Sequence, residues 1–292
     1  MFDLKAHVKA NTVDEAIRFL DQNPNARLIA GGTDVLIKLR CGDTAFSELV
    51  DINGLKALRY IKIDQQKNIC IGSGAVFTDI IESQVIQSHI PVLSDAAASV
   101  GGPQVRNVAT IGGNICNGVT SADSASALFV LNAILELKGV HGSRQIPVEA
   151  FYKGPGKVDL KPSEVLFCIK ITPENYENFF GFYYKYAMRN AMDIATIGCA
   201  VSLKTKNQNL EDFRIAYGVA GPVPMRCPNT EKYAAGQSIS ASFFRNMADC
   251  IETDVTPRTS WRATRKFRIN IVRELSKRTT LAALKRAGVI VK

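Results

Sequence analysis

Two short segments combine a glycine pair with small polar side chains, a pattern that suits anion binding. The first, residues 30–34, reads AGGTD, and the second, residues 109–124, reads ATIGGNICNGVTSADS. Glycine accepts positive φ and has no side chain, so successive backbone N–H groups can converge on one anion. Hydroxyl, amide and carboxylate groups beside them suit the hydroxyls of a polyol chain. Two such loops together predict a clamp on the pyrophosphate of a dinucleotide.

The other glycine-rich segments do not fit the common nucleotide-binding signatures. Residues 72–74 read GSG but are followed by AVF rather than by a third glycine, and residues 154–157, GPGK, lack the Walker spacing. We therefore expect neither a Rossmann unit nor a P-loop. For either glycine pair taken alone, a plain structural turn is the alternative interpretation.

The composition is that of a globular protein with reduced cysteines. The chain has 292 residues, long enough for two domains. Its seven cysteines are scattered without a CxxC pair, so the ligand spacing of a zinc or iron–sulfur site is missing and no metal site is expected. The first residues include acidic side chains and no long apolar run. We therefore expect no secretory signal and no membrane helix, and we place the protein in the cytoplasm.

The net charge of +9 is concentrated near the C-terminus. Residues 258–292 contain eleven Lys or Arg and a single acid, Glu274, whereas the rest of the chain is almost neutral. Such a segment can dock an acidic partner, bind nucleic acid or form a solvated helix face. No recognition helix, zinc finger or RNA-binding aromatic signature accompanies it, so nucleic acid is not expected as a partner.

Hydrophobic spacing predicts the elements that position the two glycine loops. Apolar residues after Thr12 predict an amphipathic helix that opens the protein and ends at residues 23–24. Residues 27–30 predict a buried strand, and Thr33 would cap a helix after the first glycine pair. The segment 109–124 has no helical or strand period. Further strands are expected at residues 48–52, 58–63, 69–72, 133–138 and 165–171, and helices at residues 78–87, 94–100 and 124–130.

A domain boundary is expected near residue 175, within a linker at residues 172–175. Residues 1–175 would form two α/β subdomains split near residue 55, with a turn at residues 151–157. Residues 176–292 would form a smaller α+β domain. Its expected strands are residues 182–186, 196–204 and 213–219, and its expected helices are residues 241–252 and 263–286.

Four segments resemble the FAD-binding subunits of molybdenum hydroxylases, most closely those of bacterial xanthine dehydrogenases. They are LIAGGTDVLIKL at residues 28–39, GPQVRNVATIGGNICNGVTSADS at 102–124, FYKGPGK at 151–157 and YKYAMRNAMDIATIG at 184–198. WRATRKFR at residues 261–268 resembles the family's Ser-x-x-Tyr-Arg region, with Phe267 where tyrosine is usual. The resemblance implies a two-subdomain FAD-binding fold of the vanillyl-alcohol-oxidase type, followed by a smaller α+β C-terminal domain.

The resemblance also implies which residues bind FAD. Residues 30–34 and 109–114 would cover the pyrophosphate from opposite sides. Asp123 would bind the sugar chain or ring, with capping of the following helix as the alternative. Lys185 would lie near the isoalloxazine, where a positive charge favours reduced flavin, with an outward-facing strand lysine as the alternative. Val100 stands where vertebrate relatives carry an aromatic residue against the flavin. No acid, base or nucleophile is expected, and the full expected set is Arg27, Leu28, Ile29, Ala30, Gly31, Gly32, Thr33, Asp34, Val100, Ala109, Thr110, Ile111, Gly112, Gly113, Asn114, Asp123, Val165, Leu166, Tyr184 and Lys185.

The implied activity is electron transfer within a larger oxidoreductase. FAD would accept electrons from the [2Fe-2S] clusters of a partner subunit and reduce NAD+, while a separate molybdopterin-binding subunit oxidises hypoxanthine or xanthine. The subunits would form a hetero-oligomer such as a dimer of heterotrimers, and the basic segment would dock on these partners or on a neighbouring copy. The alternatives are a subunit of an enzyme that oxidises aldehydes, carbon monoxide or N-heterocycles, a stand-alone flavin reductase, and a non-enzymatic basic protein that binds nucleic acid.

Overall fold

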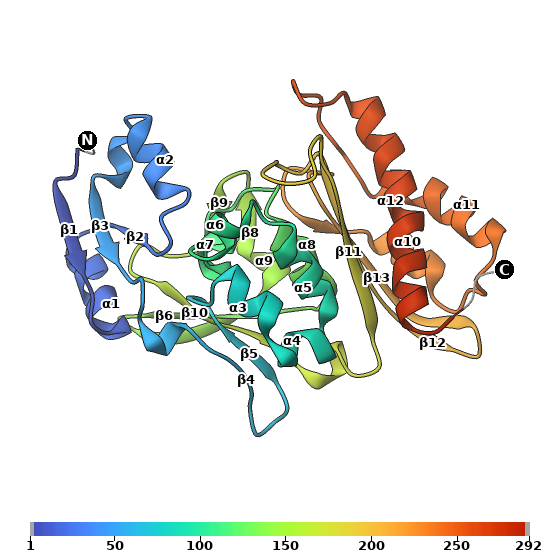
Figure 1. The fold of residues 1–292 in the computed structure, drawn as a ribbon, viewed down its shortest axis with the longest axis horizontal. Coiled ribbons are helices and arrows are strands. Elements are labelled where there is room, and N and C mark those ends of the chain that lie inside the picture. The colour runs from blue at the N-terminus through green and yellow to red at the C-terminus, as the bar shows by residue number, and fades with distance from the viewer. Residues whose placement is uncertain (1–2, 290–292) are drawn as a thin grey trace.

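A small parallel sheet forms the N-terminal lobe of the computed structural model, which describes residues 3–289 (Figure 1). Its strand order is β1 (Ala6–Lys9), β3 (Glu48–Asp51), β2 (Arg27–Ile29). Helix α1 (Val13–Gln22) buries its apolar stripe beneath this sheet, and the Thr12 hydroxyl accepts the N–H of Glu15, as a helix cap does. The predicted helix is confirmed. The expectation that it opens the protein is wrong, because β1 precedes it.

The first glycine pair connects β2 to α2 (Val35–Arg40), so the predicted order of strand, glycine pair and helix is confirmed. The predicted cap at Thr33 is wrong. Asp34 is the residue before the helix, and its side chain makes no capping hydrogen bond. The short helix η1 (Thr44–Phe46) then leads into β3.

The middle sheet has five strands in the order β4 (Ile61–Ile63), β5 (Ile69–Gly72), β10 (Val165–Ile171), β6 (Ile134–Gly139), β7 (Gly142–Pro147). All its pairings are antiparallel, which differs from the α/β alternation expected for this region. The predicted strand at residues 58–63 is shorter, because η2 (Lys56–Leu58) includes residue 58, and residues 59–60 connect η2 to β4. Strand β7 was not predicted, because it is a polar and mostly exposed edge strand.

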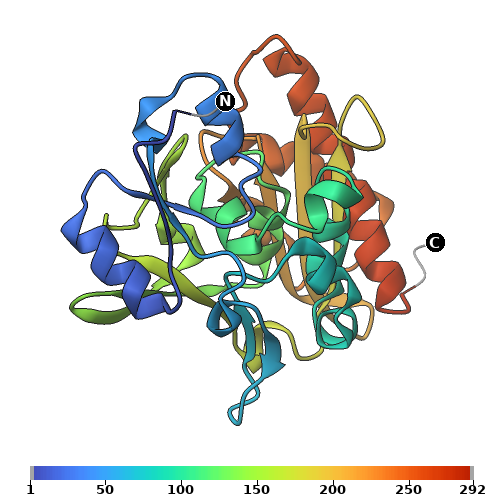
Figure 2. The same cartoon turned by 60° about the vertical axis from the view of Figure 1, so that its left-hand side comes forward.

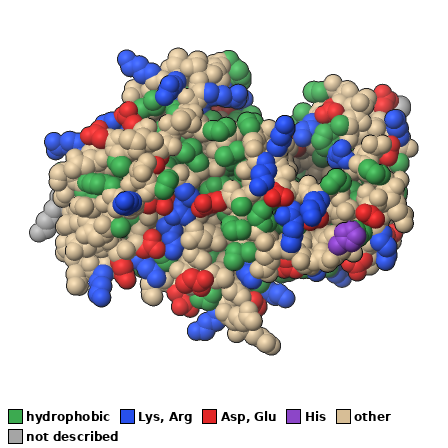
Figure 3. Space-filling model, turned by 180° about the vertical axis from the view of Figure 1, so that it is seen from behind, with side chains coloured by type: hydrophobic (Ala, Val, Ile, Leu, Met, Phe, Trp, Pro, Cys, Tyr) green, Lys and Arg blue, Asp and Glu red, His purple; other side chains and the backbone are tan. Residues whose placement is uncertain are grey.

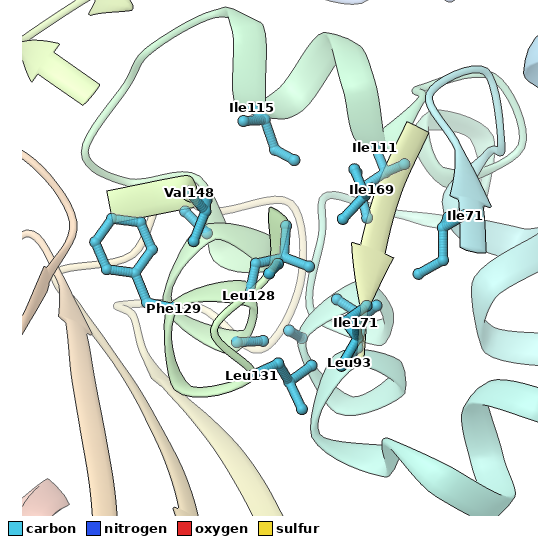
Figure 4. Packing of buried hydrophobic residues seen from close by; sticks show 14 of the residues in the cluster. Ile71, Leu93, Ile111, Ile115, Leu128, Phe129, Leu131, Val148, Ile169 and Ile171 are labelled. Carbon is cyan, nitrogen blue, oxygen red and sulfur yellow. The ribbon is translucent and has the colours of Figure 1, made fainter. Parts of the chain in front are cut away.

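Helices cover the middle sheet and enclose the main hydrophobic core, whose centre Figure 4 shows. They are α3 (Phe77–Glu82), α4 (Gln84–His89), α5 (Pro91–Ala98), α6 (Pro103–Arg106), α7 (Ile111–Cys116), α8 (Asp123–Val130) and α9 (Val148–Phe151). The helix predicted at residues 78–87 is divided at Ser83, which ends α3 and caps α4. The expectation that residues 109–124 have no helical period is wrong for α7, whose Ile111 and Ile115 both point into the core (Figure 4).

The C-terminal sheet is an antiparallel meander of β11 (Phe180–Tyr186), β12 (Ile197–Lys206), β13 (Asn209–Gly218) and β14 (Met225–Arg226). Alternate residues of β12 and β13 face opposite layers: Ala200 and Ala216 face the main core, whereas Val201 and Ile215 face the C-terminal helices. Those helices are α10 (Pro228–Ala234), α11 (Ala241–Cys250) with η4 (Ile251–Thr253), and α12 (Arg265–Arg286). The predicted strands and two long helices are confirmed, whereas α10 was missed.

The three larger sheets lie side by side, with the middle sheet and its helices between the two outer ones (Figure 1). A turn by 60° brings the N-terminal lobe forward (Figure 2). The turn predicted at residues 151–157 is a hairpin of β8 (Tyr152–Gly154) and β9 (Lys157–Val158). The short helix η3 (Pro173–Asn175) joins β10 to β11. The expected domain boundary near residue 175 falls at this connection and stays a prediction.

Candidate functional site

A cavity of about 580 Å³ lies between the N-terminal lobe and the helices of the middle sheet. Its walls come from the loop after β2, from α2, from the start of α7 and from the start of β10. From behind, the surface is hollowed where the N-terminal lobe meets the rest of the molecule, and Lys and Arg side chains lie around the hollow (Figure 3). This size is typical of small-molecule and cofactor sites.

The first glycine pair presents free hydrogen-bond donors to this cavity. Residues 31–35 all line it, and within residues 3–289 no group accepts a hydrogen bond from any of their five backbone N–H groups. Gly32 has a φ of +73°, which turns the chain from β2 into α2. A Cβ on Gly31 would lie 1.9 Å from the carbonyl oxygen of Val108, so only glycine lets this loop touch the segment before α7. The row of unpaired donors is suited to an anion.

The N–H groups of the second glycine pair, Gly112 and Gly113, are already hydrogen-bonded within the protein. The Gly112 N–H donates to the carbonyl of Ser73 at 2.9 Å, and the Gly113 N–H donates to the Thr110 hydroxyl at 3.1 Å. A Cβ on Gly112 would lie 2.6 Å from atoms of Ser73, so this glycine allows α7 to pack against the end of β5. The prediction that this pair also offers free N–H groups is wrong, although both glycines line the cavity.

Lys38 and Asn117 connect opposite walls of the cavity. The Lys38 ammonium on α2 donates to the Asn117 side-chain oxygen after α7 at 3.1 Å, and it lies 4.6 Å from the centre of the Phe46 ring. All three residues line the cavity. Sequence reasoning missed them, although Lys38 lies four residues after Asp34 and therefore on the same face of α2.

A fixed ion pair supports a third wall. The two oxygens of the Glu164 carboxylate accept hydrogen bonds from Nε and Nη2 of Arg144, both at 2.8 Å, and one of them also accepts the Lys161 N–H at 2.9 Å. Glu164 and Lys161 line the cavity just before β10. The hydrogen bonds from Arg144 lower the pKa of Glu164, which keeps this carboxylate charged.

Most of the expected site residues come together in this cavity. Its lining includes the apolar side chains of Val100, Val165 and Leu166, which form a surface suited to a flat ring. The expected residues that line it are Arg27, Leu28, Ala30, Gly31, Gly32, Thr33, Asp34, Val100, Ala109, Thr110, Gly112, Gly113, Asn114, Val165 and Leu166.

Five expected residues lie outside the lining: Ile29, Ile111, Asp123, Tyr184 and Lys185. Ile29 belongs to β2, Ile111 is part of the main core, and Tyr184 is partly exposed on β11. Their expected contact with FAD stays a prediction.

Asp123 and Lys185 form a buried pair behind the cavity wall. The Asp123 carboxylate accepts a hydrogen bond from the Lys185 ammonium at 2.9 Å and another from the Tyr183 hydroxyl at 2.7 Å. The Lys185 ammonium also donates to the carbonyl of Ser99 at 3.0 Å. Ser99 precedes Val100, which lines the cavity. Burial raises the pKa of Asp123, although Lys185 opposes this shift. Both alternatives are therefore wrong: the Asp123 side chain does not cap α8, and the Lys185 side chain is only 11% exposed.

Residues 3–289 lack two other classes of feature. These residues contain no group of three or more His, Cys, Asp or Glu side chains placed to hold a metal ion. They also contain no helix that is long and apolar enough to cross a membrane.

Each of the two parts of the chain matches a known protein family. Residues 2–173 match the family described as FAD binding domain in molybdopterin dehydrogenase. Residues 182–283 match the family described as CO dehydrogenase flavoprotein C-terminal domain. The expected fold, an FAD-binding part followed by a smaller α+β part, is thereby confirmed.

Individual relatives extend the similarity over the whole chain. The chain is 42% identical over 288 residues to the xanthine dehydrogenase FAD-binding subunit of Escherichia coli O157:H7, which covers 99% of each protein. It is 29% identical over 272 residues to the glyceraldehyde dehydrogenase medium chain of Sulfolobus acidocaldarius, covering 93% of this chain and 95% of that one. The structure of a carbon monoxide dehydrogenase chain from Hydrogenophaga pseudoflava matches with a TM-score of 0.92 at 27% identity, covering 98% and 99% of the two chains.

Proposed function

Because this chain belongs to the FAD-binding domains of molybdopterin dehydrogenases, and FAD is therefore its cofactor, we propose that it is the FAD-binding subunit of a xanthine dehydrogenase. The observation that carries the proposal is the 42% identity to the Escherichia coli subunit over 99% of both chains. The glyceraldehyde and carbon monoxide dehydrogenase medium chains are 29% and 28% identical, so a different oxidised substrate is less well supported.

The cavity fits FAD on its own geometry. The unpaired N–H groups of residues 31–35 suit the negatively charged pyrophosphate, and the side chains of Thr33, Asp34 and Asn114 suit hydroxyls of the ribose and ribityl groups. The apolar residues Val100 and Leu166 suit the ring. When bound, FAD exchanges electrons singly or in pairs, which suits a junction between one-electron and two-electron carriers.

Lys185 acts from behind this site in the proposed function. Its ammonium is neutralised in part by Asp123 and is bonded to the carbonyl of Ser99. Lys185 therefore fixes the end of α5 and the position of Val100, and adds only a weak positive potential toward the ring.

In this proposal, residues 1–175 are the FAD-binding domain, with two subdomains split near residue 55. Residues 176–292 are the C-terminal domain.

The partners belong to the same proposal. Relatives are described as medium chains or FAD-binding subunits, which supports an enzyme assembled from several chains. The proposed partners are a molybdopterin-binding subunit and a [2Fe-2S] subunit, arranged as a dimer of heterotrimers, with NAD+ as the electron acceptor. All seven cysteines are free thiols, which suits the reducing cytoplasm.

Purification and reconstitution test this function. The chain is expressed alone and together with candidate molybdenum and iron–sulfur subunits, and the FAD released on denaturation is quantified by chromatography. We expect one FAD per chain and xanthine-dependent reduction of NAD+ by the assembled enzyme. If the assembled enzyme oxidised an aldehyde or carbon monoxide but not purines, that compound would replace xanthine as the assigned substrate. A chain that takes up no FAD in any of these forms would overturn the assignment.

A further inference from the structure

The segment that enters α12 carries five cationic side chains without a carboxylate partner. We call it the basic corner; it comprises Arg258, Arg262, Arg265, Lys266 and Arg268. Within residues 3–289, none of these side chains forms an ion pair with Asp or Glu. In later turns of the same helix, by contrast, Arg273 pairs with Asp249, Arg278 with Glu274, and Arg286 with Asp95. Among the described residues, unpaired cations are therefore densest at the start of α12; further along the helix only Lys277 and Lys285 form no ion pair.

Arg268 is the buried member of the basic corner. Its residue is only 2% exposed, and its guanidinium donates to the carbonyl of Thr196 and to the Ser260 hydroxyl. Its Nε has no hydrogen-bond partner although it is buried. Burial and the nearby charges of Arg258 and Arg262 lower the pKa of Arg268. A buried charge without a counter-ion is costly. Because Arg268 is only 2% exposed, a carboxylate from outside would reduce this cost through space and would pair directly only with the more exposed members of the basic corner.

The dipole of α12 adds to the excess of positive charge at the basic corner. Helix α12 has 22 residues, and its N-terminus, at Arg265, is the positive end of the helix dipole. Cations at this end are destabilising, whereas the same charges at the C-terminal end would be stabilising. The basic corner thus combines mutual repulsion with an unfavourable dipole, and carboxylates would relieve both.

Exposed aromatic side chains indicate that the anion is part of a protein. Trp261 is 85% exposed, and the Arg262 guanidinium lies 4.2 Å from the centre of its ring. Phe267 is 41% exposed beside Tyr186. Tryptophan and arginine are the residues most often responsible for binding energy at protein interfaces. A small free anion would leave both rings exposed to water.

The basic corner is connected to the cavity wall. Phe267 and Arg268 contact the two ends of the loop between β11 and β12, at Tyr186 and Thr196. Within that loop, the Met192 N–H donates to the carbonyl of Gly101, next to Val100 of the cavity. A protein bound at the basic corner would therefore lie next to the loop that holds Gly101 beside the cavity wall.

We propose that the basic corner docks on a carboxylate-rich surface of a partner subunit of the enzyme, with Trp261 at the centre of the contact. This proposal rests on the proposed function, because it requires that the enzyme has partner subunits. The carboxylates complete the ion pairs that the chain itself leaves open, and the partner covers the exposed aromatic rings.

Matched charge reversals test the proposal. The double variant Arg265→Glu with Lys266→Glu changes two exposed residues of the basic corner, and Lys277→Glu with Lys285→Glu makes the same change in charge further along α12. Binding of each FAD-loaded chain to the co-purified partner subunits is measured at low and high salt. We expect the first variant to bind at least tenfold more weakly at low salt and to lose most of the salt dependence, and the second to bind like the wild type. Equal binding by both variants would overturn the proposal.

The single tryptophan gives a second readout. Acrylamide quenching of Trp261 is obtained as the difference between the wild type and Trp261→Phe, free and in the complex. We expect Trp261 to be quenched less by acrylamide in the complex than in the free chain. Equal quenching of Trp261 in the free chain and in the complex would overturn the proposal. So would a charge-reversal variant Arg265→Glu with Lys266→Glu that loses only self-association, or only DNA binding, while the complex with the partner subunits stays intact. FAD content is measured in parallel: a chain that carries FAD but binds no partner contradicts only this inference, whereas a chain without FAD contradicts the proposed function.

Discussion

Gly31 and Gly112 are required for close backbone contacts, in addition to any role in binding an anion. At both positions an added Cβ would overlap a neighbouring segment, Val108 in one case and Ser73 in the other. Only at the first pair do free N–H groups accompany this contact. The two glycine pairs therefore have different chemical roles although their sequences look alike.

Replacing Gly31 with alanine is expected to abolish FAD binding and to destabilise the fold. The new Cβ would lie 1.9 Å from the Val108 carbonyl oxygen, so the loop must move away from the segment before α7. We expect the free energy of unfolding to fall by about 2 kcal/mol, as for other overpacked sites. Urea unfolding and FAD content are the measurements. Gly154→Ala is the control, since no atom lies within 4 Å of its added Cβ; an equal loss there would contradict the explanation.

Glu164 is expected to stabilise the fold in a pH-dependent way. Its pKa is lowered in the folded protein by Arg144, so the stabilisation is present above the unfolded value of about 4.3 and is lost as pH falls through the lower folded value. Glu164→Gln should reduce the free energy of unfolding by about 2 kcal/mol at pH 7. The difference from the wild type should shrink as the pH approaches 3.

Urea unfolding at several pH values measures this difference. Glu211→Gln, at an exposed position of β13, is the control and should change the free energy of unfolding by less than about 0.5 kcal/mol. A difference between the wild type and Glu164→Gln that is constant from pH 3 to pH 7 would exclude the ion pair as its cause.

At the scale of elements, α2 and α7 form facing walls of the cavity from distant parts of the chain. Their direct polar link is the hydrogen bond from Lys38 to Asn117, 79 residues apart in sequence. Because both residues line the cavity, this bond fixes its width at that point. Cofactor affinity should therefore depend on it.

A double-mutant cycle on Lys38 and Asn117 tests this dependence. We expect Lys38→Met and Asn117→Ala each to weaken FAD binding about fivefold, equivalent to about 1 kcal/mol. The double variant should be little weaker than either single one, because all three lack the same bond. Fluorescence titration of the apoprotein with FAD gives the affinities. Lys56→Met, at an exposed position of η2, serves as the control, and fully additive effects would argue against the link.

At the scale of the whole molecule, Arg286 joins the last turn of α12 to the FAD-binding part. Its guanidinium contacts the Asp95 carboxylate at 2.6 and 2.8 Å, donates to the carbonyl of Gly181 and lies 4.6 Å from the centre of the Phe182 ring. One side chain thus connects α12, α5 and β11. Its removal should affect the contact between the two parts of the protein.

Arg286→Gln is expected to lower the free energy of unfolding by about 2 kcal/mol, because it removes three hydrogen bonds from a charged donor, one of them partly buried. Hydrogen exchange should increase in α5 and β11. Arg278→Gln breaks an exposed pair with Glu274 on the same helix and should change stability by only about 0.4 kcal/mol. If the two variants lost equal stability, the contact between the parts would not depend on Arg286.

Local patterns in the sequence determined much of this protein. The apolar spacing in α1, the apolar runs of β10 and of the first half of β12, and the glycine pair between β2 and α2 were readable because neighbouring residues alone set them. Most of the expected site residues also line the cavity, since residues close in sequence stay close in space.

Only the tertiary structure decided what depends on contacts between distant residues. Helix α7 contains two glycines and forms because Ser73 and the core support it, so its sequence alone favoured a loop. The pairs Lys38 with Asn117 and Asp123 with Lys185 join residues more than sixty positions apart, and no local period reports them. The unpaired state of Arg268 is likewise a property of the fold, because the sequence supplies the charge whereas packing determines whether a carboxylate can reach it.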